Sequence, residues 1–426
     1  MTRDEVRAAA ARVVQWHRRF APWFGRKEAR EHSLVYLNGL LSDQQRKSAE
    51  PIALRFARGP QGGPATQKEV VAMQGFITAS PWEADDVFAE LQAVFAEELL
   101  PTTSQGSIGT VGVIDESGFV KAGRESCGAG VQWCGRLVKF QSKPQIASEM
   151  IRRTRAAGKV RLDWVVADAL YGDSGEFLDA LEAMGQRYLV EVKKNTLVWR
   201  VDPATLPGAT PGPKRRKKLG SYRYREVQSV REIAAAVPAE SWRMLKLREG
   251  AKGPLVCEFV ALRVWAMRHN RPGPAIWLLL RRSLEQTAEV RYYVSNAGAE
   301  TPWEQMAQVS GGRWYVEEFF EDGKMHLGMA DYETRSWTSW HHHMALVGLA
   351  HLYVTLTKRD MKRGTPELTL DMALRLLRSA FARPKLSEED AIELVEYHLK
   401  RNHTARESHR KSWLQKHQRI KPEVLL

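Results

Sequence analysis

Two aspartates in this sequence each follow a short apolar run with the composition of a buried strand. Asp115 follows the run at 108–114, and Asp168 follows the run at 164–167. In α/β proteins, ligands and catalytic groups collect at the carboxyl ends of buried strands. A strand-end aspartate can also simply cap a turn or the next helix, and for either residue taken alone that structural role is the simpler interpretation.

A more specific arrangement of charges lies at 311–337. If this segment is a helix, Glu317 lies roughly 40° and Lys324 roughly 20° around its axis from Arg313. The three side chains then share one face, where they could merely pair with one another in solvent. The other faces are rich in aromatic and apolar residues, which favours a packed helix whose charged face needs a partner. Glu318 points about 100° away from Glu317 and is the weaker candidate.

The elements that must position these residues alternate between strand and helix. The strands expected at 108–114, 164–167 and 188–192 are separated by helical patterns at 143–157 and 174–184. A strand–helix–strand connection places its two strands parallel in one sheet. We therefore expect an α/β fold in which the segment 143–168 makes a parallel pairing.

The remainder of the chain suggests five regions. In the first, helices are expected at 4–19, 26–41 and 43–57, and a further helix begins at 80–83, with Ser80 as its N-cap. Two more helices are expected within 365–400, with Ser387 as a cap. The expected division is 1–100, a helical domain whose basic front half favours DNA binding; 101–194, the first part of an α/β core; 195–300, a β-rich insertion; 301–358, the last part of the core with the Glu317 helix; and 359–426, a helical basic region.

The charge and the cysteine content limit the classes of protein to which this chain can belong. The 426 residues include 64 Lys and Arg against 50 Asp and Glu, a net charge of +14 that points to a polyanionic partner such as nucleic acid. The basic cluster Lys214, Arg215, Arg216, Lys217 and Lys218 lies in a proline-rich loop, and the segment 400–421 is also basic. Three cysteines without paired spacing exclude a disulfide scaffold and a cysteine zinc site. We expect neither a membrane span nor a signal peptide, and a cytoplasmic location.

Three blocks of sequence, taken in order, resemble a known family. VIDESG at 113–118, VVADALYG at 165–172 and R-x-x-x-E-x-x-x-x-x-x-K at 313–324 are similar to bacterial insertion-sequence transposases. These are DDE superfamily endonucleases of the class whose signature helix carries Tyr, Arg, Glu and Lys. The likeness extends from FGRKEA at 24–29 through EGAKGP at 249–254 to YETRSW at 332–337.

This resemblance implies a ribonuclease-H-like core and a metal-dependent reaction on DNA. Asp115, Asp168 and Glu317 would be catalytic and would hold two Mg²⁺ ions, which Mn²⁺ could replace, because oxygen ligands suit these hard cations. Arg313 and Lys324 would hold DNA phosphates. The partners implied are the terminal inverted repeats of the element and its target DNA, together with a homodimer at synapsis. When bound to DNA, the protein would be associated with the nucleoid.

The sequence departs from the family pattern in two places. Ser310 stands where the signature has Tyr, which weakens any role of that hydroxyl in binding phosphate. Only 52 residues separate Asp115 from Asp168, an interval clearly shorter than in relatives. The join near Leu137 and Val138 has the character of a deletion that removes most of two core strands. The edge beside 108–114 would then be exposed, or covered by VQWCGRLVKF at 131–140, which we favour as a substitute strand.

Three functions follow as alternatives. The leading one is a DNA transposase that cleaves the element ends and then transfers the freed strand. The second is a catalytically inactive, internally deleted relative that only binds DNA, and the third is a plain metal-dependent nuclease. Among weaker candidates, the run 341–343 of three histidines is expected to be structural or to contact DNA, because adjacent helical residues cannot all face one ion. Of four tryptophans in the insertion, one could stack on an unpaired base: Trp199, Trp242, Trp265 or Trp277.

Overall fold

The computed structural model describes most of the chain in two compact units. The described residues are 2–59, 63–100, 108–118, 141–206, 226–250, 253–284, 289–362, 368–381 and 388–416. One unit comprises Met1–Leu91, Phe119–Leu137 and Glu321–Leu426, and the other comprises Gln92–Gly118 and Val138–Phe320. Each unit is described by itself below, the first as the helical unit and the second as the sheet unit.

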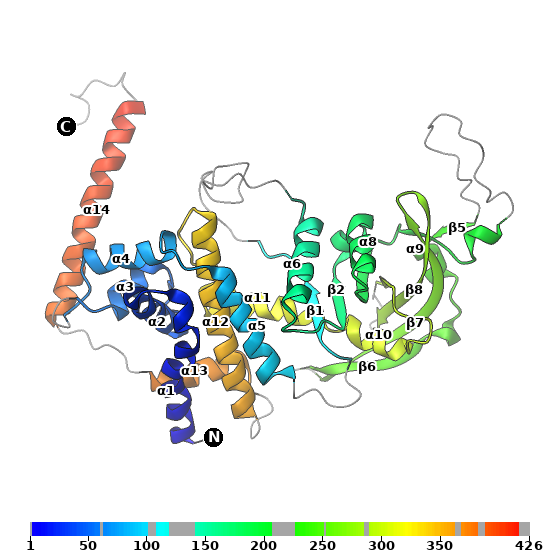
Figure 1. Ribbon diagram of the computed structural model, residues 1–426, viewed down its shortest axis with the longest axis horizontal. Coiled ribbons are helices and arrows are strands. Elements are labelled where there is room, and N and C mark those ends of the chain that lie inside the picture. The colour runs from blue at the N-terminus through cyan, green and yellow to red at the C-terminus, as the bar shows by residue number, and fades with distance from the viewer. Residues whose placement is uncertain are drawn as a thin grey trace. The chain divides into compact units, whose positions relative to one another are not determined.

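The sheet unit is built on one mixed sheet (Figure 1). Three strands at one end of this sheet run parallel: β1 (Val111–Ile114), β2 (Trp164–Ala167) and β3 (Tyr188–Val192). The sheet continues through antiparallel partners: β9 (Arg291–Ser295), β8 (Arg271–Ser283), β7 (Gly253–Arg268), β4 (Leu197–Trp199) and β5 (Val227–Ser229), with β6 (Arg243–Gly250) on β7. The predicted α/β class and the parallel pairing are therefore confirmed.

Helices form the crossovers between the parallel strands. α6 (Lys143–Ala157) begins at a capping box made by Ser142 and Gln145, and it ends at Gly158 in the left-handed conformation. α7 (Ala169–Gly172) and α8 (Gly175–Ala183) connect β2 to β3. The first strand is shorter than the predicted 108–114, because Gly109 turns the chain at a φ of 81° and the backbone N–H of Thr110 bonds to Asp163. The predicted bounds of β2 and β3 agree with the structure.

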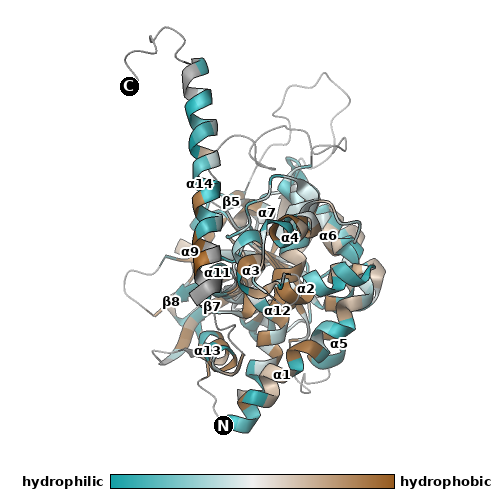
Figure 2. Cartoon of the chain, turned by 90° about the vertical axis from the view of Figure 1, so that its left-hand side faces the viewer, coloured by the Kyte–Doolittle hydropathy of each residue, from teal (hydrophilic) through white to brown (hydrophobic). Residues whose placement is uncertain are grey.

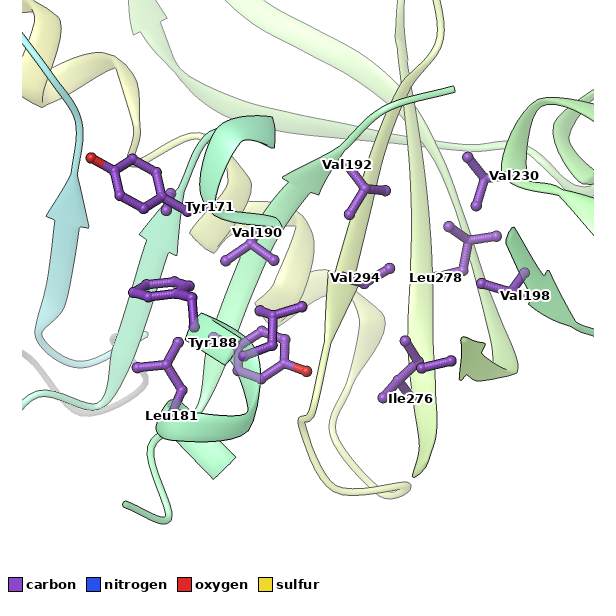
Figure 3. Packing of buried hydrophobic residues seen from close by; sticks show 14 of the residues in the cluster. Tyr171, Leu181, Tyr188, Val190, Val192, Val198, Val230, Ile276, Leu278 and Val294 are labelled. Carbon is purple, nitrogen blue, oxygen red and sulfur yellow. The ribbon is translucent and has the colours of Figure 1, made fainter. Parts of the chain in front are cut away.

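Each face of this sheet has its own apolar core. On one face, α6, α7, α8 and α9 (Val230–Ala235) cover a cluster that runs across the strands. Val190 pairs in register with Val294, and Val294 pairs with Leu278, so their side chains lie side by side in this cluster (Figure 3). On the other face, α10 (Trp303–Ser310) packs on a second cluster that contains Trp164. β2 and β3 are thus buried on both sides, whereas β1 is half-buried along its length.

The strands of 195–300 belong to the same sheet as the parallel strands. β9 pairs with β3 over four residue pairs, and β7 and β8 extend the sheet from there. Two short 3-10 helices, η4 (Pro203–Thr205) and η5 (Ala239–Ser241), lie between strands of this range. The range is β-rich as expected, and the division into five domains stays a prediction.

The helical unit combines helices from both ends of the chain. It contains α1 (Arg3–Phe20), η1 (Ala21–Phe24), α2 (Lys27–Leu41), α3 (Ala49–Phe56), α4 (Gln67–Thr78), α12 (Trp337–Lys362), α13 (Leu370–Ala380) and α14 (Glu388–Lys416). α12 packs against α2, α4 and α13. α14 is mostly hydrophilic along its length (Figure 2). Two helices span the boundary between the units: α5 (Ala84–Glu98) and α11 (Trp314–His326).

Some predicted helix ends are wrong for tertiary reasons. α5 begins at Ala84 and not at Pro81, because Trp82 is buried and its indole N–H bonds to the carbonyl of Phe76. α3 begins at Ala49 and not at residue 43, since the backbone N–H of Lys47 bonds to Asp331. Ser387 lies outside the described residues. No helix in the described ranges is long and apolar enough to cross a membrane.

Candidate active site

The two strand-end aspartates lie next to each other at one edge of the sheet. Ile114, the last residue of β1, pairs in register with Ala167, the last residue of β2. Because the strands are parallel, the residues that follow them, Asp115 and Asp168, emerge at the same edge. The sequence alone placed each aspartate at a strand end, and the register brings the two together.

Asp168 also has the structural role that a strand-end aspartate often plays. It is the N-cap of α7, and its Oδ1 accepts a hydrogen bond from the backbone N–H of Leu170 at 2.9 Å. No hydrogen bond from the described residues engages its Oδ2. Capping and a second function are therefore compatible in this one carboxylate.

Asp115 uses its two oxygens differently. Oδ1 accepts a hydrogen bond from the backbone N–H of Glu116 at 2.9 Å, and Oδ2 lies 3.4 Å from a terminal nitrogen of Arg313. Its side chain is only 10% exposed. Enclosing a carboxylate costs free energy unless it has a partner, and the partner here is the guanidinium of Arg313.

Arg313 joins the aspartate edge to the helix that carries Glu317. It directly precedes α11, and the nitrogen that contacts Asp115 also lies 3.5 Å from Oε1 of Glu317. Glu317 is about half exposed, at 53%. One guanidinium nitrogen thus lies between the two carboxylates. Of the charged face expected on this helix, Arg313 contacts Asp115 and Glu191 of the sheet unit.

Glu191 is a fourth acidic residue of this site, and sequence reasoning missed it. It lies within β3, with Oε2 at 3.7 Å from Arg313 and 3.5 Å from Arg291. Its side chain is mostly buried, at 20% exposed. The sequence could have indicated Glu191, because it is the one charged residue in the otherwise apolar strand 188–192. A charged residue in a buried strand needs a partner.

The electrostatics of the site reflect its acidic character. Burial disfavours the charged form of Arg313, but Asp115, Glu317, Glu191 and Asp168 outweigh this effect and raise its pKa. Burial, together with the charges of Glu116, Asp168 and Asp115, raises the pKa of Tyr171 to about 12, so its phenol stays protonated at neutral pH.

A glycine fixes the spacing between α7 and β3. A Cβ on Gly172 would lie 1.9 Å from the backbone carbonyl oxygen of Glu191, far inside van der Waals contact. The backbone N–H of Gly172 bonds to the carbonyl of Asp168 at 3.0 Å. The backbone of α7, the helix that Asp168 caps, is therefore packed directly against the backbone of β3 at Glu191.

Other predicted site residues are placed elsewhere or lie outside the described ranges. Lys324 is on α11, two turns after Glu317, and belongs to the helical unit. Glu318 makes no ion pair with the described residues. Ser310 is buried and its hydroxyl donates to the carbonyl of Ala307, so it turns into its own helix. Outside the described residues lie Lys214, Arg215, Arg216, Lys217, Lys218 and the segment 131–140.

The histidine run and the tryptophans of 195–300 have structural partners. His342 faces the carbonyls of Ile77 and Trp82, and His343 contacts the hydroxyl of Tyr36. Trp199 is buried, while guanidinium groups cover the rings of Trp242 and Trp277. For His342 and His343, these contacts agree with the structural alternative of the expectation that the run is structural or contacts DNA.

The carboxylates offer the ligand type of a hard divalent cation. Asp115 and Asp168 supply oxygen atoms at one sheet edge, and Glu317 lies across the guanidinium of Arg313 from Asp115. Oδ2 of Asp168, which accepts no hydrogen bond from the described residues, has the chemistry of a ligand. Within the described ranges, however, no three Asp, Glu, His or Cys side chains are grouped closely enough to hold an ion as they stand. The guanidinium of Arg313 lies between Asp115 and Glu317, so these carboxylates would close on a cation only after it moves.

Comparison with known proteins gives one family. The model of the DDE superfamily endonucleases matches residues 19–141 and 137–254, which together make up more than half of the chain. The match includes Asp115 and Asp168 and ends before α11. No curated protein matches the chain significantly. Members of this endonuclease family act on DNA and generally use divalent metals, which suits the acidic edge described above. By the extent of this match, the chain belongs to the DDE superfamily endonucleases.

Proposed function

We propose that this protein is an insertion-sequence transposase that cleaves DNA at the ends of its element and joins the freed 3′ ends to target DNA. The observation that carries the proposal is the register of β1 and β2, which sets Asp115 beside Asp168 at one edge. The ion pairs of Arg313 link Glu317 to the same edge. This arrangement supports a ribonuclease-H-like catalytic core with Asp115, Asp168 and Glu317 as its catalytic carboxylates.

The proposed cofactor is a pair of Mg²⁺ ions, for which Mn²⁺ could substitute. Asp115, Asp168 and Glu317 would hold them through carboxylate oxygens. When bound, such ions activate the attacking hydroxyl or water and stabilise the leaving oxygen. The contribution of the protein would be to hold Asp115 and Asp168 at one edge, to link Glu317 to that edge through Arg313, and to keep Asp115 largely out of solvent.

The proposed DNA contacts combine the site with basic segments elsewhere. Arg313 and Lys324 would bind phosphates near the cleaved bond, and residues 214–218 and the basic end of α14 would bind flanking DNA. Pairing of the two element ends would bring two copies of the chain together. These assignments follow from the charge of +14 and from the family resemblance of the signature helix.

The test is loss of cleavage without loss of DNA binding. Asp115→Asn, Asp168→Asn and Glu317→Gln each remove a metal-binding charge and keep side-chain size, so cleavage of DNA that carries the element ends should fall by at least about 100-fold. Glu116→Gln and Glu318→Gln, each next to a proposed ligand, are the matched controls and should cleave at near the wild-type rate. Full cleavage by any one of the three variants would refute its assignment.

The second candidate is an inactive, internally deleted relative that only binds DNA. A specific observation favours it: the family model matches in two segments that meet at 137–141, as a loss of sequence at this point would produce. In addition, no strand among the described residues pairs with the outer edge of β1. If the wild-type chain binds its element ends but cleaves them with neither Mg²⁺ nor Mn²⁺, this second function replaces the first.

A further inference from the structure

Arg313 occupies a position that a phosphate-binding residue alone does not require. Its side chain is 21% exposed, and its two terminal nitrogens contact Asp115, Glu317 and Glu191 at 3.4–3.7 Å. With Asp168 close enough to raise its pKa, the guanidinium of Arg313 stands among four carboxylates, one of which, Glu191, also contacts Arg291. Without that charge, the carboxylates would repel one another at short range.

The contacts of Arg313 are looser than those of a permanent structural arginine. Charge-assisted hydrogen bonds between nitrogen and oxygen are typically about 2.7–2.9 Å long. Arg268 in the same unit comes near this range, at 2.8 Å from Tyr188 and 3.0 Å from Glu182. The contacts of Arg313 are all longer, and its buried Nε has no hydrogen-bond partner among the described residues. Burying a donor without a partner costs free energy, so this position is only partly satisfied.

The three carboxylates that contact Arg313 differ in the role proposed for them. Asp115 and Glu317 are proposed metal ligands, so a divalent ion would compete with the guanidinium for the same oxygens. Glu191 is not a proposed ligand, and it lies on a strand whose backbone is fixed against Gly172. An arginine expelled from Asp115 and Glu317 would therefore keep its contact with Glu191.

We infer that Arg313 is the internal counter-cation of the metal-free site, that divalent ions displace it from Asp115 and Glu317, and that Glu191 holds it at the site after displacement. This inference rests on the proposed metal-binding role of Asp115 and Glu317. Glu191 is in this view a positioning residue, which acts through Arg313. The displaced guanidinium, still held at one side, then presents its remaining N–H groups to a DNA phosphate.

The decisive measurement is Mn²⁺ binding to the full chain without DNA, by calorimetry, with thermal unfolding in EDTA and in Mn²⁺. Arg313→Gln should bind Mn²⁺ about tenfold more tightly than the wild type, since the ion no longer displaces a cation. The same variant should have a lower midpoint of thermal unfolding in EDTA than the wild type. Mn²⁺ should raise this midpoint by more in the variant than in the wild type. Arg291→Gln is the control, because Arg291 contacts Glu191 but neither proposed ligand. It should change Mn²⁺ affinity less than Arg313→Gln does.

Two further variants keep the outcome clear. If Arg313→Gln does not fold, Arg313→Met also removes the charge and keeps an unbranched side chain, so it should likewise bind Mn²⁺ more tightly than the wild type. Unchanged or weaker Mn²⁺ binding by the substituted chain would overturn the inference. If instead Asp115→Asn leaves Mn²⁺ affinity unchanged, the proposed metal site itself fails, which is a separate result.

The proposed role of Glu191, which is to hold the displaced Arg313, is tested separately by measuring DNA affinity. With Ca²⁺ as the metal, Glu191→Gln and Arg313→Gln should weaken DNA binding by similar factors, and the double variant should be no weaker than either one, because both changes remove the same phosphate contact. Independent, multiplicative losses would mean that Glu191 does not act through Arg313.

Discussion

The side chain of Asp168 caps α7 and is also a proposed metal ligand, and substitutions can separate these two roles. Asparagine caps helices about as well as aspartate, whereas alanine does not. Asp168→Asn should therefore keep nearly the wild-type free energy of unfolding, and Asp168→Ala should lose about 1 kcal/mol. Urea unfolding of the two variants measures this difference. Equal destabilisation by both would show that the hydrogen bond to Leu170 adds no stability.

A buried histidine should make folding stability depend on pH. Burial lowers the pKa of His17 to about 4, and its Nε2 contacts the hydroxyl of Ser33 at 2.7 Å. Between pH of about 6.5 and 4, the unfolded chain binds a proton that the folded chain does not. His17 alone should therefore lower the free energy of unfolding by up to about 3 kcal/mol as the pH falls through this window, and its contribution should level off below it.

The variant His17→Gln should show a shallower fall of stability with pH. Burial likewise lowers the pKa of His351 to about 4, so part of the fall should remain. His403 is exposed on α14, and His403→Gln should follow the wild-type curve. Chemical unfolding at several pH values between 7 and 4 compares the three proteins. An identical slope in His17→Gln would assign the pH dependence to other groups.

For single residues, the sequence was sufficient where a residue ends an apolar run or lies at helical spacing from other charged residues. Asp115 and Asp168 were visible because each ends an apolar run, and Arg313, Glu317 and Lys324 because of their spacing. Glu191 was not found, since its significance comes from an arginine more than a hundred residues away in sequence. The position of Arg313 among carboxylates was likewise beyond prediction, because spacing gives the face of a helix and not what lies opposite it.

Among the helices, α2 and α3 approach each other so closely that one glycine is required. A Cβ on Gly39 would lie 2.6 Å from side-chain atoms of Ile52, whereas a Cβ on Gly75 in α4 would meet nothing within 4 Å. Gly39→Ala should destabilise the protein by about 1–3 kcal/mol through overpacking. Gly75→Ala should stabilise it by about 0.5–1 kcal/mol, since alanine is the better helix former.

The midpoint of thermal unfolding tests this pair of substitutions. It should shift down for Gly39→Ala and up for Gly75→Ala. A stabilising effect at both positions would mean that α2 and α3 separate readily.

Elements were predicted well where local sequence decides them. The parallel strands are continuous apolar runs in the sequence. The capping box of α6 is formed by Ser142 and Gln145, which are three residues apart. The start of α5 was wrong because Ser80 and Pro81 form a good local start, while the burial of Trp82 outweighs it. The pairing of β9 with β3 was also missed, since pairing between distant strands leaves no local signal.

For the whole molecule, the charge of +14 should make DNA affinity strongly dependent on salt. Each phosphate contact contributes about 0.9 to the slope of log K against log salt. The double variant Lys217→Gln and Lys218→Gln should lower the slope by up to about 1.8 if both residues contact phosphate. Fluorescence anisotropy at several salt concentrations gives the slope.

The matched control for this experiment removes two arginines that already have partners. Arg152 and Arg153 both pair with Glu149 on α6. Substituting both with glutamine removes the same charge and should change the slope less. If the two double variants have equal slopes, residues 214–218 contribute only general charge.

The contact between Gly172 and the carbonyl of Glu191 has a consequence for how this sequence can change over generations. Any other residue at position 172 would need α7 or β3 to move, because a Cβ would lie 1.9 Å from a backbone oxygen. Such a movement would shift α7, the helix that Asp168 caps, away from β3. Selection that preserves the acidic edge would therefore also preserve a residue with no side chain. Among random substitutions introduced along 165–175, we expect position 172 to yield no active survivors.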